Sequence, residues 1–177
     1  NSSAASDVYK RQDSTFLGDV LERVALSCGK DREGLCRAIA GGFMLSADNA
    51  HAVHPDSPEK SDPTNRCYLN EGVVVKHSPR YASDALTAGV FQAICQKAGV
   101  PVQVYYNNSR IPGGGTLGNL SGSHVALPTV DIGLPQLSMH SPYETAGAQD
   151  LGYMVQAMEA FYKTVLTVTG QDAYEIS

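Results

Sequence analysis

Apolar residues recur at three- and four-residue steps along several stretches of the chain, which is the spacing of one helix face. The first stretch starts at Thr15, where Asp13 or Ser14 offers the side-chain oxygen that caps a helix. The second ends at Gly41-Gly42, a helix stop signal. The pattern predicts one helix from Thr15 onward and three others over Arg32–Ala40, Asp84–Ala98 and Gln149–Thr167.

Short apolar runs alternate with these helices and predict β-strands. The runs cover Phe43–Asp48, Val73–Val75, Val102–Tyr106 and Thr129–Ile132. Strands that alternate with helices of this length are typical of an α/β layered fold with a mainly parallel sheet. Two long stretches, the polar Pro55–Asn70 and the glycine-rich Asn107–Ser123, are predicted as loops, and loops of that length in a compact domain are often functional.

Composition narrows the class of protein. The chain has 177 residues, of which 42% are hydrophobic and 18% charged, so it suits one domain with a core and not a disordered segment. No apolar run reaches the roughly 18 residues of a membrane span, which argues against a membrane protein. The net charge is −5, and no basic stripe with interleaved aromatic residues indicates a nucleic-acid partner.

The cysteines Cys28, Cys36, Cys67 and Cys95 are scattered along the chain and form no C-x-x-C pair. This spacing argues against a thiolate zinc site. We interpret the four residues as small buried hydrophobic side chains. Together with the missing secretory signal, they favour a reducing, cytoplasmic location.

The first twelve residues, NSSAASDVYKRQ, differ from the rest of the chain because they are small, polar and without periodicity. Segments of this kind are set apart before fold reasoning, as foreign or processing sequence. We therefore expect residues 1–12 to be a non-native or disordered leader and residues 13–177 to form the folded part.

Candidate chemistry begins in SADNAHAVH, where Asp48, His51 and His54 stand three residues apart. Asp48 follows an apolar strand, and ligand sites of open α/β sheets lie beyond the carboxyl ends of strands. A carboxylate there can bind a metal ion, but D-x-x-H alone is a weak signal. The alternative is that Asp48 caps a turn and both histidines form ordinary hydrogen bonds. His140 also follows a strand, although a lone histidine is more often structural.

Lys76 and a glycine-rich loop offer possible anion sites. A lysine that ends a buried strand, as in VVVK, can hold a carboxylate; the alternative is a lysine whose stem packs on apolar surface. In IPGGGTLGN, glycines permit close backbone approach to a ligand, and a following helix would offer free N–H groups. The loop matches neither the G-x-G-x-x-G fingerprint nor a P-loop, so no nucleotide site is predicted. His124 is interpreted as structural.

Four segments together resemble the aspartyl aminopeptidase family of dizinc exopeptidases. They are SADNAHAVHPDSPEK, VVVKHSPRYASDA, IPGGGTLGN and DIGLPQLSMHSPYETAG, and they stand in the family's order at about its spacing. The resemblance implies a three-layer α/β/α zinc-exopeptidase-like domain. It also implies zinc as the cofactor, with two ions in an intact site, a peptide substrate with an acidic amino-terminal residue, and a homo-oligomer.

The resemblance implies roles for residues around the substrate. Lys76 matches a lysine that contacts the acidic side chain, and Tyr81 matches a nearby tyrosine that contacts the substrate. The glycine loop, including Gly113 and Gly114, matches one that borders the active site. Gly115 departs from the family, which usually has Ser or Thr there, so no side-chain role is assigned to it.

The resemblance also implies that Asp48 and His140 are ligands of the two zinc ions and that His51 lies near the substrate. The family's other site residues are a histidine ligand, a bridging aspartate and a Glu-Glu pair that includes the general base. These precede the segment STFLGDVLERV in the family, and this chain contains no Glu-Glu dipeptide. We therefore interpret residues 13–177 as the carboxyl-terminal part of a metallopeptidase catalytic domain, without its general base.

Two alternatives stay open. The chain could belong to a dizinc exopeptidase of different specificity. It could also be a non-catalytic fragment or an interaction protein that packs against partners, because a truncated sheet exposes an unpaired strand edge and apolar surface.

Overall fold

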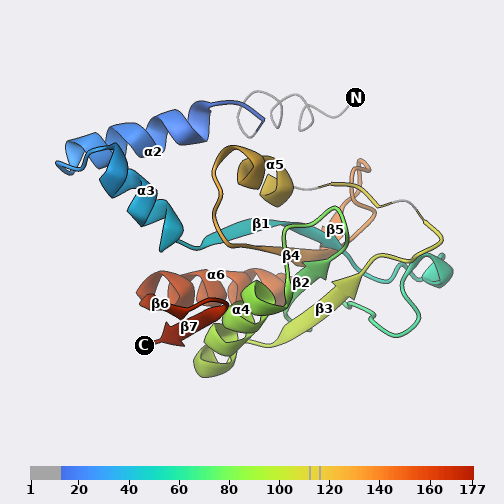
Figure 1. The fold of residues 1–177 in the computed structure, drawn as a ribbon. Helices are drawn as coiled ribbons and strands as arrows, with labels where there is room; N and C mark the ends of the chain where they lie inside the picture. The colour runs from blue at the N-terminus through green and yellow to red at the C-terminus, as the bar shows by residue number, and fades with distance from the viewer. Residues whose placement is uncertain (1–12, 112, 116) are drawn as a thin grey trace.

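Figure 1 shows a central sheet with helices on both sides in the computed structural model, which describes residues 13–111, 113–115 and 117–177. Helix α5 lies on one side, with α2 and α3 near it, and α4 and α6 lie on the other. The helices are α2 (Phe16–Ser27), α3 (Arg32–Ala40), α4 (Ala85–Ala98), α5 (Leu117–His124) and α6 (Ala148–Lys163), with a 3-10 turn, η1, at Pro58–Lys60.

The sheet has the strand order β1-β4-β2-β3, with the short β5 (Thr145–Ala146) beside β4. Its main strands are β1 (Met44–His51), β2 (Val73–His77), β3 (Val102–Tyr106) and β4 (Thr129–Leu137). β1 runs parallel to β4 and β2 runs parallel to β3, whereas β2 is antiparallel to β4. The predicted α/β class with a mainly parallel sheet is confirmed, and the reversal between β2 and β4 divides the sheet into two parallel halves.

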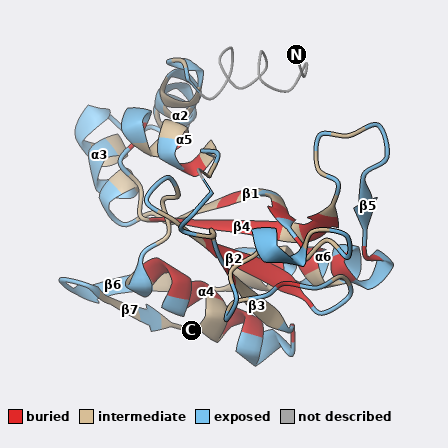
Figure 2. Cartoon of the chain, turned by 90° about the vertical axis from the view of Figure 1, so that its right-hand side faces the viewer, coloured by how far each residue is buried: buried red, intermediate tan, exposed pale blue. Residues whose placement is uncertain are grey.

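One face of the sheet forms the main apolar core. Its completely buried strand residues are Val73, Val75, Val130 and Ile132, and they belong to one cluster with apolar residues of α4 and α6. Each such side chain contributes about 1.5–3 kcal/mol when it leaves water. Figure 2 shows buried segments in β2, β4 and parts of α4 and α6, whereas α2 and α3 contain no buried residue.

Helix α4 has local signals at both ends. Asp84 Oδ1 accepts a hydrogen bond from Thr87 N at 2.7 Å, and Thr87 Oγ1 accepts one from Asp84 N at 3.0 Å, which completes a capping box. At the other end Gly99 has a φ of 68°, a left-handed conformation that suits glycine. The predicted helix Asp84–Ala98 is therefore confirmed, with Asp84 as its cap.

The end of the chain differs from the prediction. Helix α6 ends at Lys163 and not at Thr167, and a hairpin of β6 (Leu166–Gly170) and β7 (Ala173–Ile176) follows. The apolar spacing of the helix continues into this segment, but the run LTVT is rich in β-branched residues, which favour strands. Lys97 Nζ of α4 donates to Ile176 O at 2.8 Å and attaches the hairpin to the helix.

Strands β1 and β4 extend beyond their predicted ends. β1 continues to His51 instead of stopping at Asp48, and β4 continues to Leu137 instead of Ile132. Every residue of β1 pairs with a residue of β4, so the ladder supports residues that the local pattern does not favour, such as Pro135. Helix α5 occupies the end of the stretch that was predicted as a loop.

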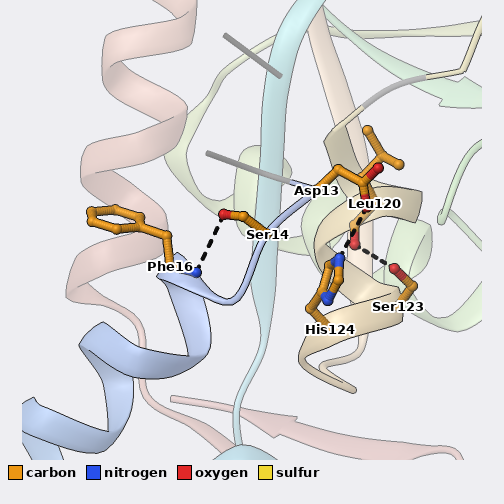
Figure 3. Close-up of polar contacts among 6 residues, drawn as sticks. All are labelled: Asp13, Ser14, Phe16, Leu120, Ser123 and His124. Carbon is orange, nitrogen blue, oxygen red and sulfur yellow. Dashed lines mark hydrogen bonds and ion pairs between the residues drawn. The ribbon is translucent and has the colours of Figure 1, made fainter. Parts of the chain in front are cut away.

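Figure 3 shows how the start of α2 is attached to α5. Ser14 Oγ accepts a hydrogen bond from Phe16 N at 3.3 Å, whereas the cap position itself is Thr15. Asp13 Oδ1 lies 3.1 Å from His124 Nε2 at the end of α5. His124 therefore joins two segments that are 111 residues apart in sequence.

The cysteines do not share one environment. Cys67 and Cys95 are buried, and burial raises the pKa of each thiol to about 12. Cys28 and Cys36 are exposed, so the interpretation of all four as buried residues is wrong for these two. They lie on α2–α3, which cover no core, and this explains their exposure.

We expect iodoacetamide at about pH 8 to alkylate Cys28 and Cys36 in the folded protein and to spare Cys67 and Cys95. The thiolate is the reactive form, and burial both blocks access and suppresses ionisation of the second pair. Peptide mass spectrometry gives the extent of modification at each site. Equal modification of Cys67 and Cys28 under native conditions would contradict the structure, and a denatured sample provides the control in which all four react.

None of the described helices is long and apolar enough to cross a membrane. The longest, α6, has 16 residues, whereas a span needs about 20. The predicted leader, residues 1–12, lies outside the described residues, and its separation from the folded part stays a prediction.

Candidate functional site

Charged side chains gather on the sheet face opposite α4 and α6. Side chains alternate between the two faces along a strand. Val75 and Ile132 pair across β2 and β4, and both belong to the apolar core. Lys76 follows Val75, and Asp131 precedes Ile132, so both side chains point to the face opposite the apolar core. By the same alternation, Asp48 of β1 points to that face as well. Three ionisable groups therefore occupy one face of three neighbouring strands.

Lys76 is the most unusual of these groups because its side chain is only 1% exposed. Its Nζ donates to Asn49 O at 3.2 Å and lies 5.3 Å from the centre of the Tyr81 ring. Burial lowers the pKa of Lys76, and the negative charges of Asp48 and Asp131 act in the opposite direction. No carboxylate in the described part of the chain forms an ion pair with this ammonium. It therefore keeps donors for an anionic partner.

Tyr81 lies in the loop between β2 and α4 and packs against a second cluster that contains Val74 and Tyr105. Burial raises the pKa of Tyr81 to about 12, and the neighbouring Tyr105 and the charge of Asp131 add to this effect. The phenol is therefore protonated at neutral pH and can donate a hydrogen bond. The Tyr81 ring lies beside Lys76 Nζ, and the predicted contact of Tyr81 with a substrate stays a prediction.

Asp131 is a site residue that the sequence reasoning did not single out. It is completely buried near the start of β4, and its Oδ2 accepts a hydrogen bond from Ala82 N at 2.6 Å. Its charge reaches both Lys76 and Tyr81. A carboxylate within a buried apolar strand, as in TVDIG, is rare unless it has partners, and this was the available signal.

Two of the predicted residues, His51 and His140, lie toward the edge where β1 and β4 end. His51 is the last residue of β1, and His140 follows the end of β4. Partial burial of the ring lowers the pKa of His51, and the charges of His140 and Lys76 lower it further. Asp48 is exposed within β1, and its Oδ1 accepts a hydrogen bond from Asn49 N at 2.7 Å. The expectation that Asp48 ends its strand is wrong.

His140 stands in a loop with unusual backbone angles. Its φ is 67° and that of Ser138 is 55°, a left-handed region that residues other than glycine seldom adopt and that is common at functional sites. Glu144 Oε1 accepts a hydrogen bond from His140 N at 2.6 Å, and Ser138 Oγ lies 3.3 Å from His54 Nε2. Glu144 and His54 thus restrain the backbone that carries His140. No local sequence pattern predicts that Glu144 accepts a hydrogen bond from His140 N.

The glycine loop is attached to the loop that carries Tyr81. Gly113 O accepts a hydrogen bond from Arg80 Nη1 at 2.7 Å. A Cβ at Gly113 would lie 3.2 Å from the Asn107 side chain, so this position favours glycine, whereas Gly114 is exposed with open space around it. The structure therefore brings the loop of Gly113 next to Arg80, a contact that sequence reasoning did not find.

Asp48 and His140 offer the carboxylate oxygen and the imidazole nitrogen that zinc takes as ligands in proteins. Among the described residues, however, no group of three or more His, Cys, Asp or Glu side chains is arranged to hold a metal ion. Zinc in proteins takes about four ligands. The two residues therefore fit zinc in type but do not complete a site by themselves.

The structure is a mixed α/β fold with a mainly parallel sheet and charged side chains on one sheet face. Residues 5–162 match the sequence profile of the family described as aminopeptidase I zinc metalloprotease (M18). The match covers far more than half of the chain. The chain belongs to the M18 family of zinc aminopeptidases.

Curated relatives carry the same family name. The chain is 44% identical over 164 residues to an M18 family aminopeptidase 2 of Clostridium acetobutylicum, covering 92% of this chain and 38% of that protein. It is 41% identical over 156 residues to an M18 family aminopeptidase 2 of Mycobacterium tuberculosis, covering 87% of this chain and 36% of that protein. The chain thus spans less than two fifths of the length of these relatives.

Solved structures share the fold. The structure described as crystalline prApe1 matches with a TM-score of 0.80 and 27% identity, over 88% of this chain and 33% of that one. A chain from the Ape4 and Nbr1 complex matches with a TM-score of 0.78 and 33% identity, over 85% of this chain and 29% of that one. The mApe1 dodecamer of Saccharomyces matches with a TM-score of 0.73 and 25% identity, over 88% and 34% of the two chains.

Proposed function

We propose that the protein containing this chain is a zinc aminopeptidase that removes an acidic residue from the amino terminus of peptides. The observation that carries the acidic specificity is Lys76, a completely buried ammonium without an ion-pair partner among the described residues. Burying such a charge is costly, and perturbed buried groups of this kind concentrate at functional sites. A carboxylate side chain of the substrate would supply the missing partner.

In this proposal Asp48 and His140 each contribute a ligand to one of two zinc ions. Zinc, when bound, supplies a Lewis acid for the scissile carbonyl and an activated water. The further ligands and the general base come from residues other than those described here. His51, whose lowered pKa makes it neutral at pH 7, offers a hydrogen-bonding group to the substrate. Gly113 and Gly114 border the substrate, and Tyr81 contacts it.

We also propose that the protein is a homo-oligomer of the cytoplasm. The relation to a dodecameric aminopeptidase supports the assembly. Exposed apolar residues along α6 support it as well, because patches of this kind mark protein interfaces. They are Leu151, Val155 and Tyr162, with exposed fractions of 60%, 57% and 80%.

A non-catalytic interaction protein is the second candidate, and the same exposed apolar residues favour it. The two candidate functions make different demands on the charged sheet face opposite α4 and α6. An interaction protein has no use for a buried ammonium beside two carboxylates, since packed apolar residues would be at least as stable there. This difference favours the peptidase.

The full-length protein is expected to hydrolyse aspartyl and glutamyl chromogenic substrates, and a zinc chelator should abolish this turnover. The isolated 177-residue chain should release no product and should bind zinc weakly in titration calorimetry, because Asp48 and His140 alone cannot complete a site. Tight zinc binding or turnover by the isolated chain would refute this division of the site. A full-length protein that is inactive with every amino-terminal residue would favour the interaction protein.

A further inference from the structure

Asp131 is completely buried at the centre of the charged sheet face, yet the proposed chemistry gives it no part. It is not among the residues proposed to hold zinc or to contact the substrate. A carboxylate buried to this degree is retained only when its partners compensate for the lost water. Its contacts therefore indicate what it does.

Asp131 anchors the loop between β2 and α4 by three hydrogen bonds. Its Oδ2 accepts one from Ala82 N at 2.6 Å, directly after Tyr81. Its backbone N donates to Ser83 Oγ at 2.8 Å, and the same hydroxyl donates to Asp131 O at 3.4 Å. One residue of β4 thus holds both residues that follow Tyr81. The position of the Tyr81 ring over Lys76 depends on this attachment.

The same carboxylate supports the first turn of α5, which follows the glycine loop. A Cβ built on Gly118 would lie 2.6 Å from Asp131 Oδ1 and 2.7 Å from Oδ2, closer than carbon and oxygen atoms approach in proteins. Gly118 is itself buried. Helix α5 can therefore pack on Asp131 only because this position has no side chain. The Tyr81 loop and the first turn of α5 meet at one carboxylate.

We propose that Asp131 is a positioning residue that shapes the pocket for the acidic side chain of the substrate. It acts through Tyr81 and Lys76 and does not touch the substrate. This inference rests on the proposed function, because the pocket is the one in which Lys76 meets a substrate carboxylate. Asp131 holds the loop that places the Tyr81 ring over the Lys76 ammonium, and α5 packs against the same Asp131 carboxylate.

The charge of Asp131 has a second effect on this pocket. Together with Asp48 it surrounds Lys76 with negative charge, which favours the protonated lysine. The Asp131 carboxylate accepts a hydrogen bond from Ala82 N. Among the described residues no carboxylate forms an ion pair with Lys76 Nζ, so its donors stay available, although burial lowers its pKa. This leaves the substrate carboxylate as the direct partner.

Two glycines of α5 provide a matched pair of variants. Gly118→Ala places a methyl group on the Asp131 carboxylate, whereas Gly122→Ala adds the same group to the same helix with nothing within 4 Å. In the full-length enzyme, Gly118→Ala is expected to lower the ratio of kcat/KM for aspartyl over alanyl substrates by about 10- to 100-fold, since small displacements in a site have effects of this size. Gly122→Ala should leave the ratio unchanged.

Amide hydrogen exchange supplies a readout that is independent of turnover. Peptides covering residues 78–84 should exchange faster in Gly118→Ala and in Asp131→Ala than in the wild type, because Ala82 N loses its acceptor. Asp131→Asn keeps an acceptor oxygen of the same shape and should preserve slow exchange. Its ratio of kcat/KM for aspartyl over alanyl substrates should stay closer to wild type than that of Asp131→Ala.

The possible results distinguish a failure of the role proposed for Asp131 from a failure of the proposed acidic specificity. Unchanged exchange in Gly118→Ala and Asp131→Ala would overturn the anchoring role of Asp131. Faster exchange with an unchanged substrate ratio would also overturn the proposal, because Asp131 would then be structural only. A wild-type enzyme that hydrolyses alanyl and aspartyl substrates equally would overturn the acidic specificity itself, and with it the pocket, whatever the exchange result.

Discussion

Replacing Lys76 by methionine is expected to remove the preference for acidic residues while leaving hydrolysis of neutral amino-terminal residues nearly unchanged. A buried charge pair that loses one partner costs about 2–5 kcal/mol, so kcat/KM for aspartyl substrates should fall by roughly 30- to 5000-fold. Methionine has a similar length and fills the space of the lysine stem. Steady-state kinetics with aspartyl and alanyl substrates gives the comparison.

Lys60→Met is the matched control because Lys60 is an exposed lysine in η1. A uniform loss for both substrates in Lys76→Met, or no loss at all, would contradict the assigned role. A uniform loss would mean that Lys76 supports the site as a whole. No loss would leave the buried ammonium without a function in substrate selection.

The same substitution is expected to keep or raise stability. Burial lowers the pKa of Lys76 below its ordinary value of 10.5, so folding disfavours the charged form. The charged lysine destabilises the folded state fully at pH values below its lowered folded-state pKa. This destabilisation decreases as the pH rises and is lost above about 10.5, where the unfolded lysine also loses its proton. The stability gain of Lys76→Met should therefore shrink toward alkaline pH. Thermal unfolding across this pH range measures it.

Asp150→Ala is expected to lower the free energy of unfolding by about 3–5 kcal/mol. Asp150 is completely buried in the first turn of α6, where its carboxylate accepts hydrogen bonds from Asn70 N at 2.6 Å and Gly72 N at 3.0 Å. Truncation leaves both amides without an acceptor in a dry environment. For a domain of this size the loss corresponds to a decrease in Tm of roughly 10 °C.

Glu159→Gln is the control for this experiment. Glu159 lies on the same helix and pairs with Lys163 at 2.6 Å, but both side chains are mostly exposed, so no measurable change in Tm is expected. Urea unfolding at neutral pH compares the two variants. An Asp150→Ala protein as stable as the Glu159→Gln protein would show that the segment before β2 does not depend on this carboxylate.

Elements with local signals were predictable from the sequence, whereas elements that depend on distant partners were not. Helix α4 has its capping box and its terminal glycine within the helix segment itself. The extension of β4 through Pro135 depends instead on pairing with β1, which lies far away in the chain. The hairpin of β6 and β7 was missed because its apolar residues continue the spacing of α6.

Among the residues of the candidate site, too, only those with a local sequence signal were predictable. Asp48, Lys76 and His140 were found because each stands at or near the end of an apolar run, and the resemblance then gave each a role that stays a prediction. Asp131 and Glu144 act through hydrogen bonds to backbone atoms. The contact of Asp131 reaches across 49 residues, and that of Glu144 depends on a left-handed turn. No periodicity encodes either contact.

The strand order has a consequence for the path by which the chain folds. β2, α4 and β3 follow one another within residues 73–106 and can associate as soon as they are synthesised. β1 precedes them, but its partner is β4, and Met44 meets Thr129 only after both have formed. Closing contacts between such distant segments is slow. Docking of β1 therefore limits the folding rate, and until it occurs Leu45 and Ala47 lack their apolar partners, which makes this stage the one most exposed to aggregation.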